Sequence, residues 1–192
     1  MPTLSLFTPP AAPLALRLRR AGTSTAVRVA GIVAFALLAA LGAQVRIQLW
    51  EVPFTLQTLA VYGAGLFLGA RSGALSMALY LALGLVFPVF VDGGTGVAYL
   101  MGATGGYLVA LPLVAALTGA LTERRPTLAA SVGAGLAGMA VLFALGALWL
   151  NLVAGHASWE VTMARGVVPF LAADLLKLGV AAGAFAAARR LG

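Results

Sequence analysis

The chain has 192 residues, of which 62% are hydrophobic and only 9% are charged, and its mean hydropathy is +1.05. This composition lies far outside the range of soluble domains and is typical of an integral membrane protein. The absence of cysteine excludes disulfides and thiolate metal sites, and one histidine with five carboxylates leaves little material for a metal centre, so we expect no bound metal or cofactor.

Basic residues give the chain a net charge of +7, but they lie at the edges of apolar blocks. This placement is typical of membrane topology signals and not of a nucleic-acid-binding surface. A phosphate-binding GxxxxGK[ST] motif is missing, and Lys177 is the only lysine. The chain therefore cannot drive transport with ATP by itself.

Residues 1–24 are expected to form a cytoplasmic N-terminal tail. The first 20 residues are rich in proline and end in Arg17, Arg19 and Arg20. The apolar run that follows, residues 26–43, exceeds the ~7 to 15 residues of a signal-peptide core. A retained first membrane helix is therefore favoured over a cleaved signal peptide.

Six apolar segments follow, each near the ~20 residues that cross a bilayer core of ~30 Å. We place them at about 25–44, 55–69, 71–89, 104–122, 127–152 and 165–188. The second and third are separated by a short turn around Arg71 and predict a helical hairpin. The expected fold is an all-α integral membrane protein in which residues 25–190 form one substrate-binding domain of six transmembrane helices, because the blocks lack the alternation of β-barrel strands.

Arginines set the expected orientation of these spans. With the N-terminus inside, nine arginines fall on the inner side and two on the outer side, so both termini are predicted to be cytoplasmic. The nine are Arg17, Arg19, Arg20, Arg28, Arg71, Arg124, Arg125, Arg189 and Arg190, and the two are Arg46 and Arg165.

Small residues four apart recur on the first helix, for example Ala36 and Ala40. Such spacing lets helices approach closely, either inside the fold or against another membrane protein. Because an alanine-rich helix produces this spacing by chance, the pattern alone does not decide between the two.

Two charged residues interrupt the last apolar segment, FLAADLLKLGVAAGAF at 170–185. Asp174 and Lys177 are three residues apart and share one side of a helix. Each charge costs ~2.5 to 3.5 kcal/mol in a membrane helix, and such residues usually line a pathway or ligand cavity. An internal ion pair that fastens the helix to its neighbours is the structural alternative.

Two further stretches offer polar groups on the predicted outer side. Residues 88–107 contain six glycines, whose backbone can approach a ligand closely, and Thr104 precedes the fourth helix. Residues 48–62 carry Gln57 in the first turn of the second helix, where Thr55 can cap it. A flexible loop and an interhelical hydrogen bond are the corresponding structural alternatives.

The residue types suggest two catalytic interpretations. Ser72 and His156 cannot form a serine-protease dyad, because the topology places them on opposite sides of the membrane. An enzyme that uses Asp174 and Lys177 as acid and base stays possible on spacing, although no metal-binding carboxylates or second titratable group lie nearby.

Four motifs in matching order resemble the BioY family, the biotin-binding S components of energy-coupling factor (ECF) transporters. They are VPFTLQTLAV at 52–61, LFLGARSGALSMALYLALGLVFPVF at 66–90, GVAYLMGATGGYLVA at 96–110 and GVVPFLAADLLK at 166–177. The resemblance implies a six-helix S-component fold in a bacterial cytoplasmic membrane, with a biotin site that opens outward. It also implies a transmembrane coupling protein and two cytoplasmic ATPases as partners, docked partly through small residues such as Ala36 and Ala40.

By this resemblance, Asp174 binds the ureido ring of biotin, and Lys177 faces the carboxylate or tunes Asp174. Asp92 is a further candidate at the ureido ring. The other candidate ligand contacts are Gly102, Thr104, Tyr99 and Gln57. The alternatives are an S component for another vitamin, such as thiamine or riboflavin, and a small membrane enzyme.

Overall fold

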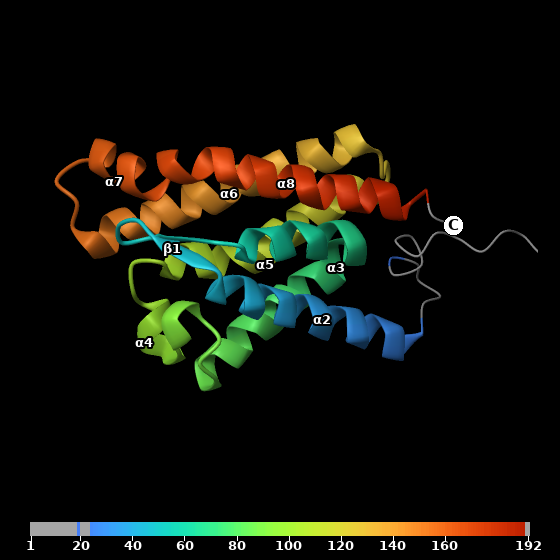
Figure 1. Ribbon diagram of the computed structural model, residues 1–192, viewed down its shortest axis with the longest axis horizontal. Coiled ribbons are helices and arrows are strands. Elements are labelled where there is room, and N and C mark those ends of the chain that lie inside the picture. Colours follow the sequence, from blue (N-terminus) through green and yellow to red (C-terminus); the bar gives the residue numbers. More distant parts are fainter. Residues whose placement is uncertain (1–18, 20–23, 191–192) are drawn as a thin grey trace, which may run out of the picture.

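The computed structural model describes residue 19 and residues 24–190, which form an elongated bundle of helices (Figure 1). We call the end that carries β1, α4 and α7 the strap end, and the opposite end the tip end. The elements are α2 (Thr25–Gln44), β1 (Arg46–Gln48), β2 (Pro53–Thr55), α3 (Gln57–Val86), η1 (Val91–Gly93), α4 (Gly96–Leu100), α5 (Gly105–Glu123), α6 (Leu128–Ala154), α7 (Trp159–Gly166) and α8 (Val168–Ala188).

Helix α3 is a helical hairpin, as the sequence predicts. Gln57 Nε2 donates a hydrogen bond of 2.6 Å to the Tyr80 hydroxyl, although a straight helix would separate residues 23 positions apart by about 35 Å. The chain reverses at Gly69, where φ is 80° and ψ is −178°. Only glycine adopts this conformation readily, so the turn lies at Gly69 and not at Arg71.

The predicted all-α membrane fold is confirmed. Among the described helices, five stretches are long and apolar enough to cross a bilayer when both arms of α3 are counted as one. Counting the two arms separately gives the six predicted spans. The second span begins at Gln57 and not at residue 55, because Thr55 belongs to strand β2.

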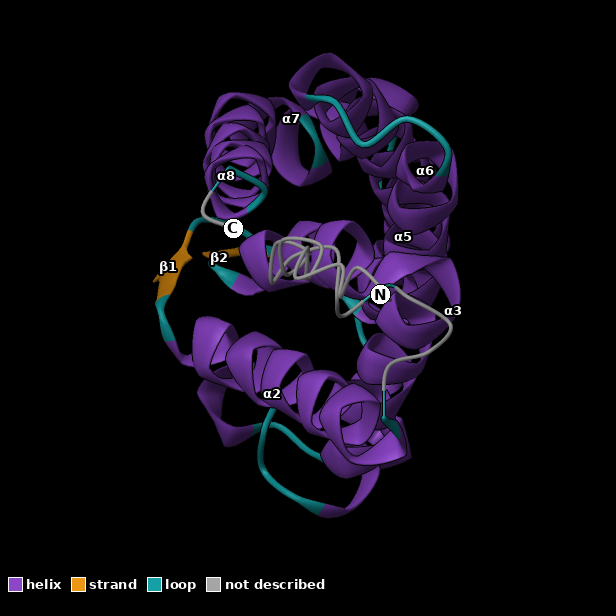
Figure 2. Ribbon diagram, turned by 90° about the vertical axis from the view of Figure 1, so that its right-hand side faces the viewer, coloured by secondary structure: helices purple, strands orange, loops and turns teal. Residues whose placement is uncertain are grey.

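The first arm of α3 runs through the centre of the bundle. Its residues 60–66 are all buried, and Figure 2 shows α2 and α8 on opposite sides of it. The second arm meets α5 closely: a Cβ at Gly119 would lie 2.3 Å from the Ala70 backbone nitrogen, which excludes a larger residue. The two arms of α3 are thereby packed against α2, α8 and α5 at the centre of the bundle.

Polar side chains from other elements cap the hairpin at the tip end. Arg19 donates to the carbonyl of Gly65 at 3.0 Å and to the carbonyl of Thr122 at 3.2 Å, both near the ends of helices where carbonyls lack partners. The Glu123 carboxylate accepts from the Ala70 N–H at 2.8 Å, at the start of the second arm. The arms and α5 are thereby joined at one point.

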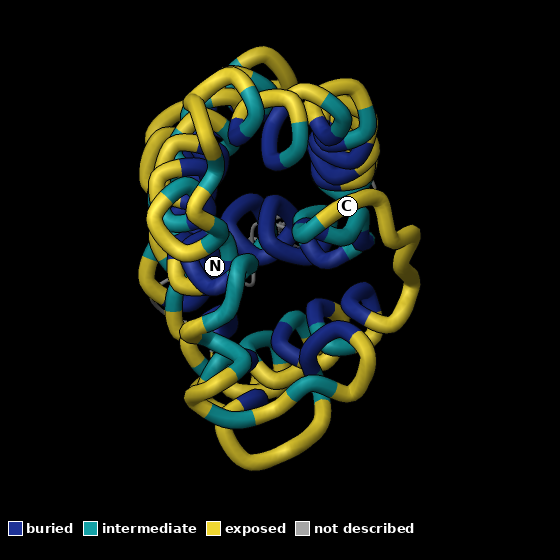
Figure 3. Tube along the Cα trace, turned by 90° about the vertical axis from the view of Figure 1, so that its left-hand side faces the viewer, coloured by how far each residue is buried: buried dark blue, intermediate teal, exposed yellow. Residues whose placement is uncertain are grey.

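Burial follows the same plan in cross-section (Figure 3). Residues that face the central arm are buried, whereas large apolar side chains such as Leu41, Leu152 and Leu176 are exposed by 64–71% on the outer faces. In water such a surface would be a liability, but in a bilayer it faces lipid. The outer surface of the bundle therefore agrees with the spans derived from hydropathy.

The small residues of α2 pack mainly inside the fold. Ala36, Ala39 and Ala43 are fully buried, and Ala36 and Ala39 belong to the main core cluster. Ala40 is only half-buried. Of the pair predicted to dock a partner, Ala40 and not Ala36 has side-chain surface to offer, and the docking role stays a prediction.

Replacing Gly69 should destabilise the hairpin. A Gly69→Ala variant has to hold a side chain at φ 80°, which costs of order 1–3 kcal/mol. We expect a lower melting temperature for the protein purified in detergent. Gly183→Ala in α8 is the matched control, because its Cβ meets nothing within 4 Å and alanine favours a helix. Equal melting of the two variants would contradict a reversal at residue 69.

Candidate substrate-binding site

A cavity near the strap end encloses about 610 Å³ of empty space, counted to its open mouth. Its wall is largely apolar, with one buried charged cluster. The lining residues are Val52, Pro53, Thr55, Gln57, Thr58, Val91, Tyr99, Thr104, Tyr107, Leu108, Leu111, Leu142, Phe143, Gly166, Phe170, Asp174 and Lys177.

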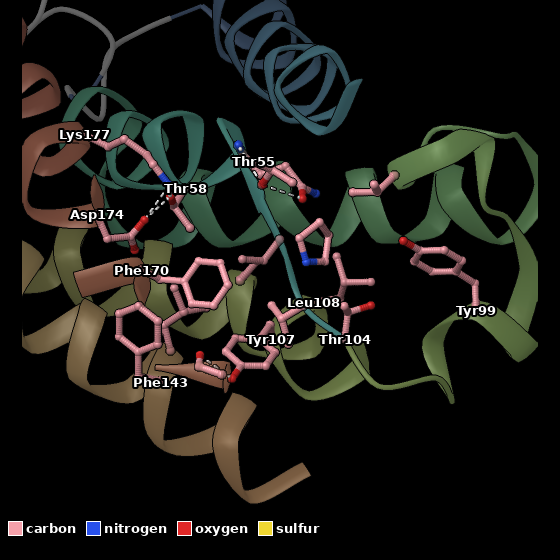
Figure 4. Close-up of a pocket in the computed structure, with 17 residues that line it drawn as sticks. Thr55, Thr58, Tyr99, Thr104, Tyr107, Leu108, Phe143, Phe170, Asp174 and Lys177 are labelled. Atoms are coloured by element: carbon pink, nitrogen blue, oxygen red, sulfur yellow. Dashed lines mark hydrogen bonds and ion pairs between the residues drawn. The ribbon is translucent and has the colours of Figure 1, made fainter. Parts of the chain in front are cut away.

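The charged cluster is built by α3 and α8 (Figure 4). Asp174 and Lys177 are exposed by only 2% and 7%, and Lys177 Nζ lies 2.6 Å from Asp174 Oδ1. The Thr58 hydroxyl donates to the same oxygen at 2.7 Å and accepts from Lys177 at 3.0 Å. The Tyr62 hydroxyl donates to Asp174 Oδ2 at 3.0 Å. Both carboxylate oxygens are therefore satisfied, and a net-neutral pair faces the cavity.

Gln57 contributes a second polar group from the entry of α3. The Thr55 hydroxyl donates to Gln57 Oε1 at 3.1 Å, and Gln57 Nε2 donates to Tyr80. The Thr55 oxygen also accepts from the Gln57 N–H at 3.4 Å, as expected for a cap at a helix start. Gln57 thus lines the cavity and also holds the two arms of the hairpin together.

The residues predicted in the glycine-rich loop separate into two groups. Tyr99 and Thr104 line the cavity, and the Tyr99 ring stacks on Phe90 with centroids 5.1 Å apart. Gly102 lies outside the lining, and its carbonyl accepts from Trp149 Nε1 at 2.8 Å. Asp92 also lies outside, with a side chain that is 55% exposed and paired with Arg46. The structure therefore brings Tyr99 and Thr104, but not Asp92 and Gly102, to the wall with Asp174.

A short antiparallel hairpin of β1 and β2 covers part of the cavity, and we call residues 45–56 the strap. Val52, Pro53 and Thr55 of the strap are among the lining residues. The sequence showed no strand signal here, because two strands of three residues are too short for a recognisable alternation. The strap and the glycine-rich loop are therefore the parts of the wall that lie outside the long membrane helices.

Ion pairs fasten the strap on two sides. Glu51 accepts from Arg165 Nη1 at 2.7 Å, and Arg46 pairs with Asp92 of η1. Glu51 Oε1 also lies 3.6 Å from Nε2 of His156, whose Nδ1 lies 2.9 Å from the Thr162 hydroxyl. Backbone hydrogen bonding and the Arg165 guanidinium lower the pKa of Glu51, so the carboxylate stays ionised at neutral pH.

Several residues of the cavity wall and of the charged cluster escaped the sequence analysis. Thr58 and Tyr62 are four residues apart in an apolar helix, so their shared face is a signal that could have been used. Phe170 precedes Asp174 by one turn and shares its face in the same way. Tyr107 and Phe143 carry no such signal, because aromatic residues in apolar segments are common.

Comparison with known proteins places the chain in a family. A model of the BioY family matches residues 16–192. The biotin transporter BioY of Thermotoga maritima is 39% identical over 149 residues, which cover 77% of this chain and 87% of that protein. The probable biotin transporter BioY of Pyrococcus horikoshii is 35% identical over 157 residues, or 81% of this chain and 92% of that protein.

A solved structure shares the fold. It is a crystal structure of the S-component for biotin from an ECF-type ABC transporter, with a TM-score of 0.81 over 90% of this chain and 96% of that chain. The two sequences are 21% identical over this match, so this likeness concerns the fold alone. The family model and the two relatives above show that the chain belongs to the BioY family.

Proposed function

We propose that this protein binds biotin and takes it up across the membrane as the substrate-binding S component of an ECF transporter. The observation that carries the proposal is the buried Asp174–Lys177 pair at the wall of an otherwise largely apolar cavity, in a chain of the BioY family. Relatives named as biotin transporters support the choice of ligand. The family consists of transporter subunits, so the acid–base enzyme interpretation of this pair is set aside.

Biotin complements this cavity chemically. Its ureido ring offers two N–H donors and a carbonyl, its sulfur ring is apolar, and its tail ends in a carboxylate. An ionised Asp174 can accept from the ureido N–H groups, and Lys177 can offer positive charge to the carboxylate. Aromatic and aliphatic side chains such as Phe143, Phe170 and Leu142 suit the apolar rings.

The remaining predicted contact residues differ in whether they can touch the ligand directly. Tyr99, Thr104 and Gln57 lie on the wall and can touch the ligand directly. Asp92 can assist only if its pair with Arg46 opens. Gly102 acts indirectly, since its carbonyl is used to hold the loop against α6. No cofactor is required for binding.

The proposal includes an orientation and partners. The strap end faces outward and both termini are cytoplasmic, in agreement with the nine arginines predicted on the inner side. Transport then requires a transmembrane coupling protein and two cytoplasmic ATPases, because the chain has no nucleotide-binding motif. Ala40 on α2 is one candidate contact to the coupling protein. The proposed location of the protein is the cytoplasmic membrane of a bacterium.

Equilibrium binding to the purified protein tests the ligand, and Asp174 tests the site. We expect tight binding of biotin but not of thiamine or riboflavin, and at least ~10-fold weaker biotin binding by Asp174→Asn, because a charge-assisted hydrogen bond is worth ~1.5 to 3 kcal/mol. The Asp174→Asn/Lys177→Met double variant leaves no unpaired buried charge, so it controls for misfolding of the single variant. It should fold and still bind biotin weakly. Failure of the wild type to bind biotin would refute the ligand assignment.

Lys177 should discriminate between charged and neutral ligands. In Lys177→Met the side chain stays unbranched and only one atom shorter but loses its charge, so binding of biotin should weaken by about 10-fold or more, and binding of biotin amide much less. The measurement is the ratio of the two dissociation constants. If both ligands lose equally, Lys177 serves the fold and not the carboxylate.

Glu51 should control how fast the strap releases its ligand. Exposed ion pairs contribute ~0.2 to 1 kcal/mol, so Glu51→Gln should speed biotin dissociation by roughly 2–5-fold at neutral pH. The backbone hydrogen bond and the Arg165 guanidinium lower the pKa of Glu51, so the ion pair is fully formed above the ordinary value of 4.5 and is lost as pH falls through the lowered pKa. Glu160→Gln is the matched control, since Glu160 is exposed on α7 and forms no ion pair with any described residue. Identical dissociation rates for the wild type and Glu51→Gln would rule out a role of the Glu51–Arg165 pair in retaining the ligand.

A further inference from the structure

His156, the only histidine of the chain, lies in the connection between α6 and α7 and has a side chain that is only 5% exposed. A buried imidazole needs a hydrogen-bond partner for each of its two nitrogens. Nδ1 lies 2.9 Å from the Thr162 hydroxyl, whereas Nε2 is buried without a hydrogen bond to any described residue. One side of the ring is therefore held, and the other side carries an unsatisfied polar atom.

The residue that faces Nε2 is Glu51 of the strap. Its Oε1 lies 3.6 Å from Nε2, just beyond hydrogen-bond distance, and 2.7 Å from Arg165 Nη1. Its Oε2 is also buried and has no hydrogen bond to a described residue. Buried polar atoms without partners cost free energy, and a hydrogen bond to a carboxylate is stronger when its donor is charged. A proton on the ring would therefore strengthen the contact between the two residues.

Thr162 allows the ring to exist in both protonation states. Its hydroxyl accepts from Asn151 Nδ2 at 2.8 Å and lies 3.4 Å from the Ser158 carbonyl oxygen. The hydroxyl proton can point to Nδ1 of a neutral ring, or to the Ser158 carbonyl when Nδ1 itself donates. Nε2 carries a proton toward Glu51 in both cases. Charging the ring thus strengthens the existing contact and needs no rearrangement of the site.

The charges around the ring determine the sign of the effect. Arg165 holds the same carboxylate, and Glu160 on α7 is exposed and forms no ion pair with any described residue. Backbone hydrogen bonding and Arg165 lower the pKa of Glu51. The carboxylate therefore stays ionised over the range of about pH 5 to 8 in which histidine side chains change charge. Attraction between the ring and Glu51 is strongest at the acidic end of this range and weakens as pH rises.

We propose that His156 is a positioning residue that acts through Glu51 and holds the strap over the cavity more firmly when its ring is protonated. Glu51 belongs to the strap, whereas His156 belongs to the connection that leads into α7, and Figure 1 shows β1 and α7 at the same end of the bundle. The contact thus joins the loop part of the cavity wall to the helices. This inference rests on the proposed binding of biotin for its ligand and adds a dependence of retention on the pH at the strap end.

The first test is the rate of biotin dissociation from protein purified without a histidine tag, at about pH 7.5 and about pH 5.5. In the wild type, dissociation should be about 2–5-fold slower at the lower pH, the range expected from a partly exposed ion pair. His156→Gln can donate a hydrogen bond but cannot become charged, so it should lose this pH dependence. Glu51→Gln should lose it too, because the charged ring then has no carboxylate to attract. Biotin amide should show the wild-type pH dependence, which excludes titration of the ligand as the cause.

Hydrogen exchange of the amides of residues 46–55 gives a second readout that needs no ligand. Comparison of variants at one pH cancels the intrinsic exchange rate. The strap of His156→Gln should exchange faster than the wild-type strap at about pH 5.5 and nearly equally at about pH 7.5. Glu51→Gln should show the same loss of acid protection, so the test does not depend on the folding of one variant.

The outcomes separate this inference from the proposed function. Dissociation that keeps its pH dependence in His156→Gln, or strap exchange that is equal in the wild type and both variants at the lower pH, would overturn the role of His156 and leave the biotin assignment intact. Acid protection of the strap that requires both His156 and Glu51, in a wild type that does not bind biotin, would support the strap contact and refute the proposed function.

Discussion

The fold around the cavity depends on keeping Asp174 and Lys177 together inside a membrane helix. Either charge alone would be costly in these apolar surroundings, since breaking a buried pair leaves an uncompensated ion. Thr58 and Tyr62 complete the pair by satisfying the carboxylate from the neighbouring helix. The first arm of α3 must therefore lie beside α8 at a fixed height, and its central position in the bundle follows from this requirement.

The reversal at Gly69 makes that position possible. It lets one apolar stretch serve as two spans, and it places the first arm in the protein interior while the second arm packs against α5. Contacts between the arms, such as Gln57 with Tyr80, lie close to the cavity. The hairpin thus connects the packing of the membrane core to the polar groups of the ligand site.

Much of this arrangement is predictable from sequence, for identifiable reasons. Hydropathy determines the spans, and the cost of intramembrane charge singles out Asp174 and Lys177. The exact turn at Gly69 was missed because the neighbouring Arg71 is the more visible interruption of hydropathy. The positions of Asp92 and Gly102 depend on the path of a loop, which side-chain chemistry does not determine. The strands of the strap were not predicted, because three residues are too few to show the alternation of a β-strand.

The caps of the hairpin tip also bear on how the bundle assembles during synthesis. The Gly65 carbonyl accepts from Arg19, which precedes the hairpin and also donates to the Thr122 hydroxyl, and the Ala70 N–H donates to Glu123 at the end of α5. A hairpin that has just entered the bilayer therefore keeps uncovered polar groups until the next span has followed it. Completion of the tip then marks the point at which four spans become one unit, before α6 and α8 close the cavity.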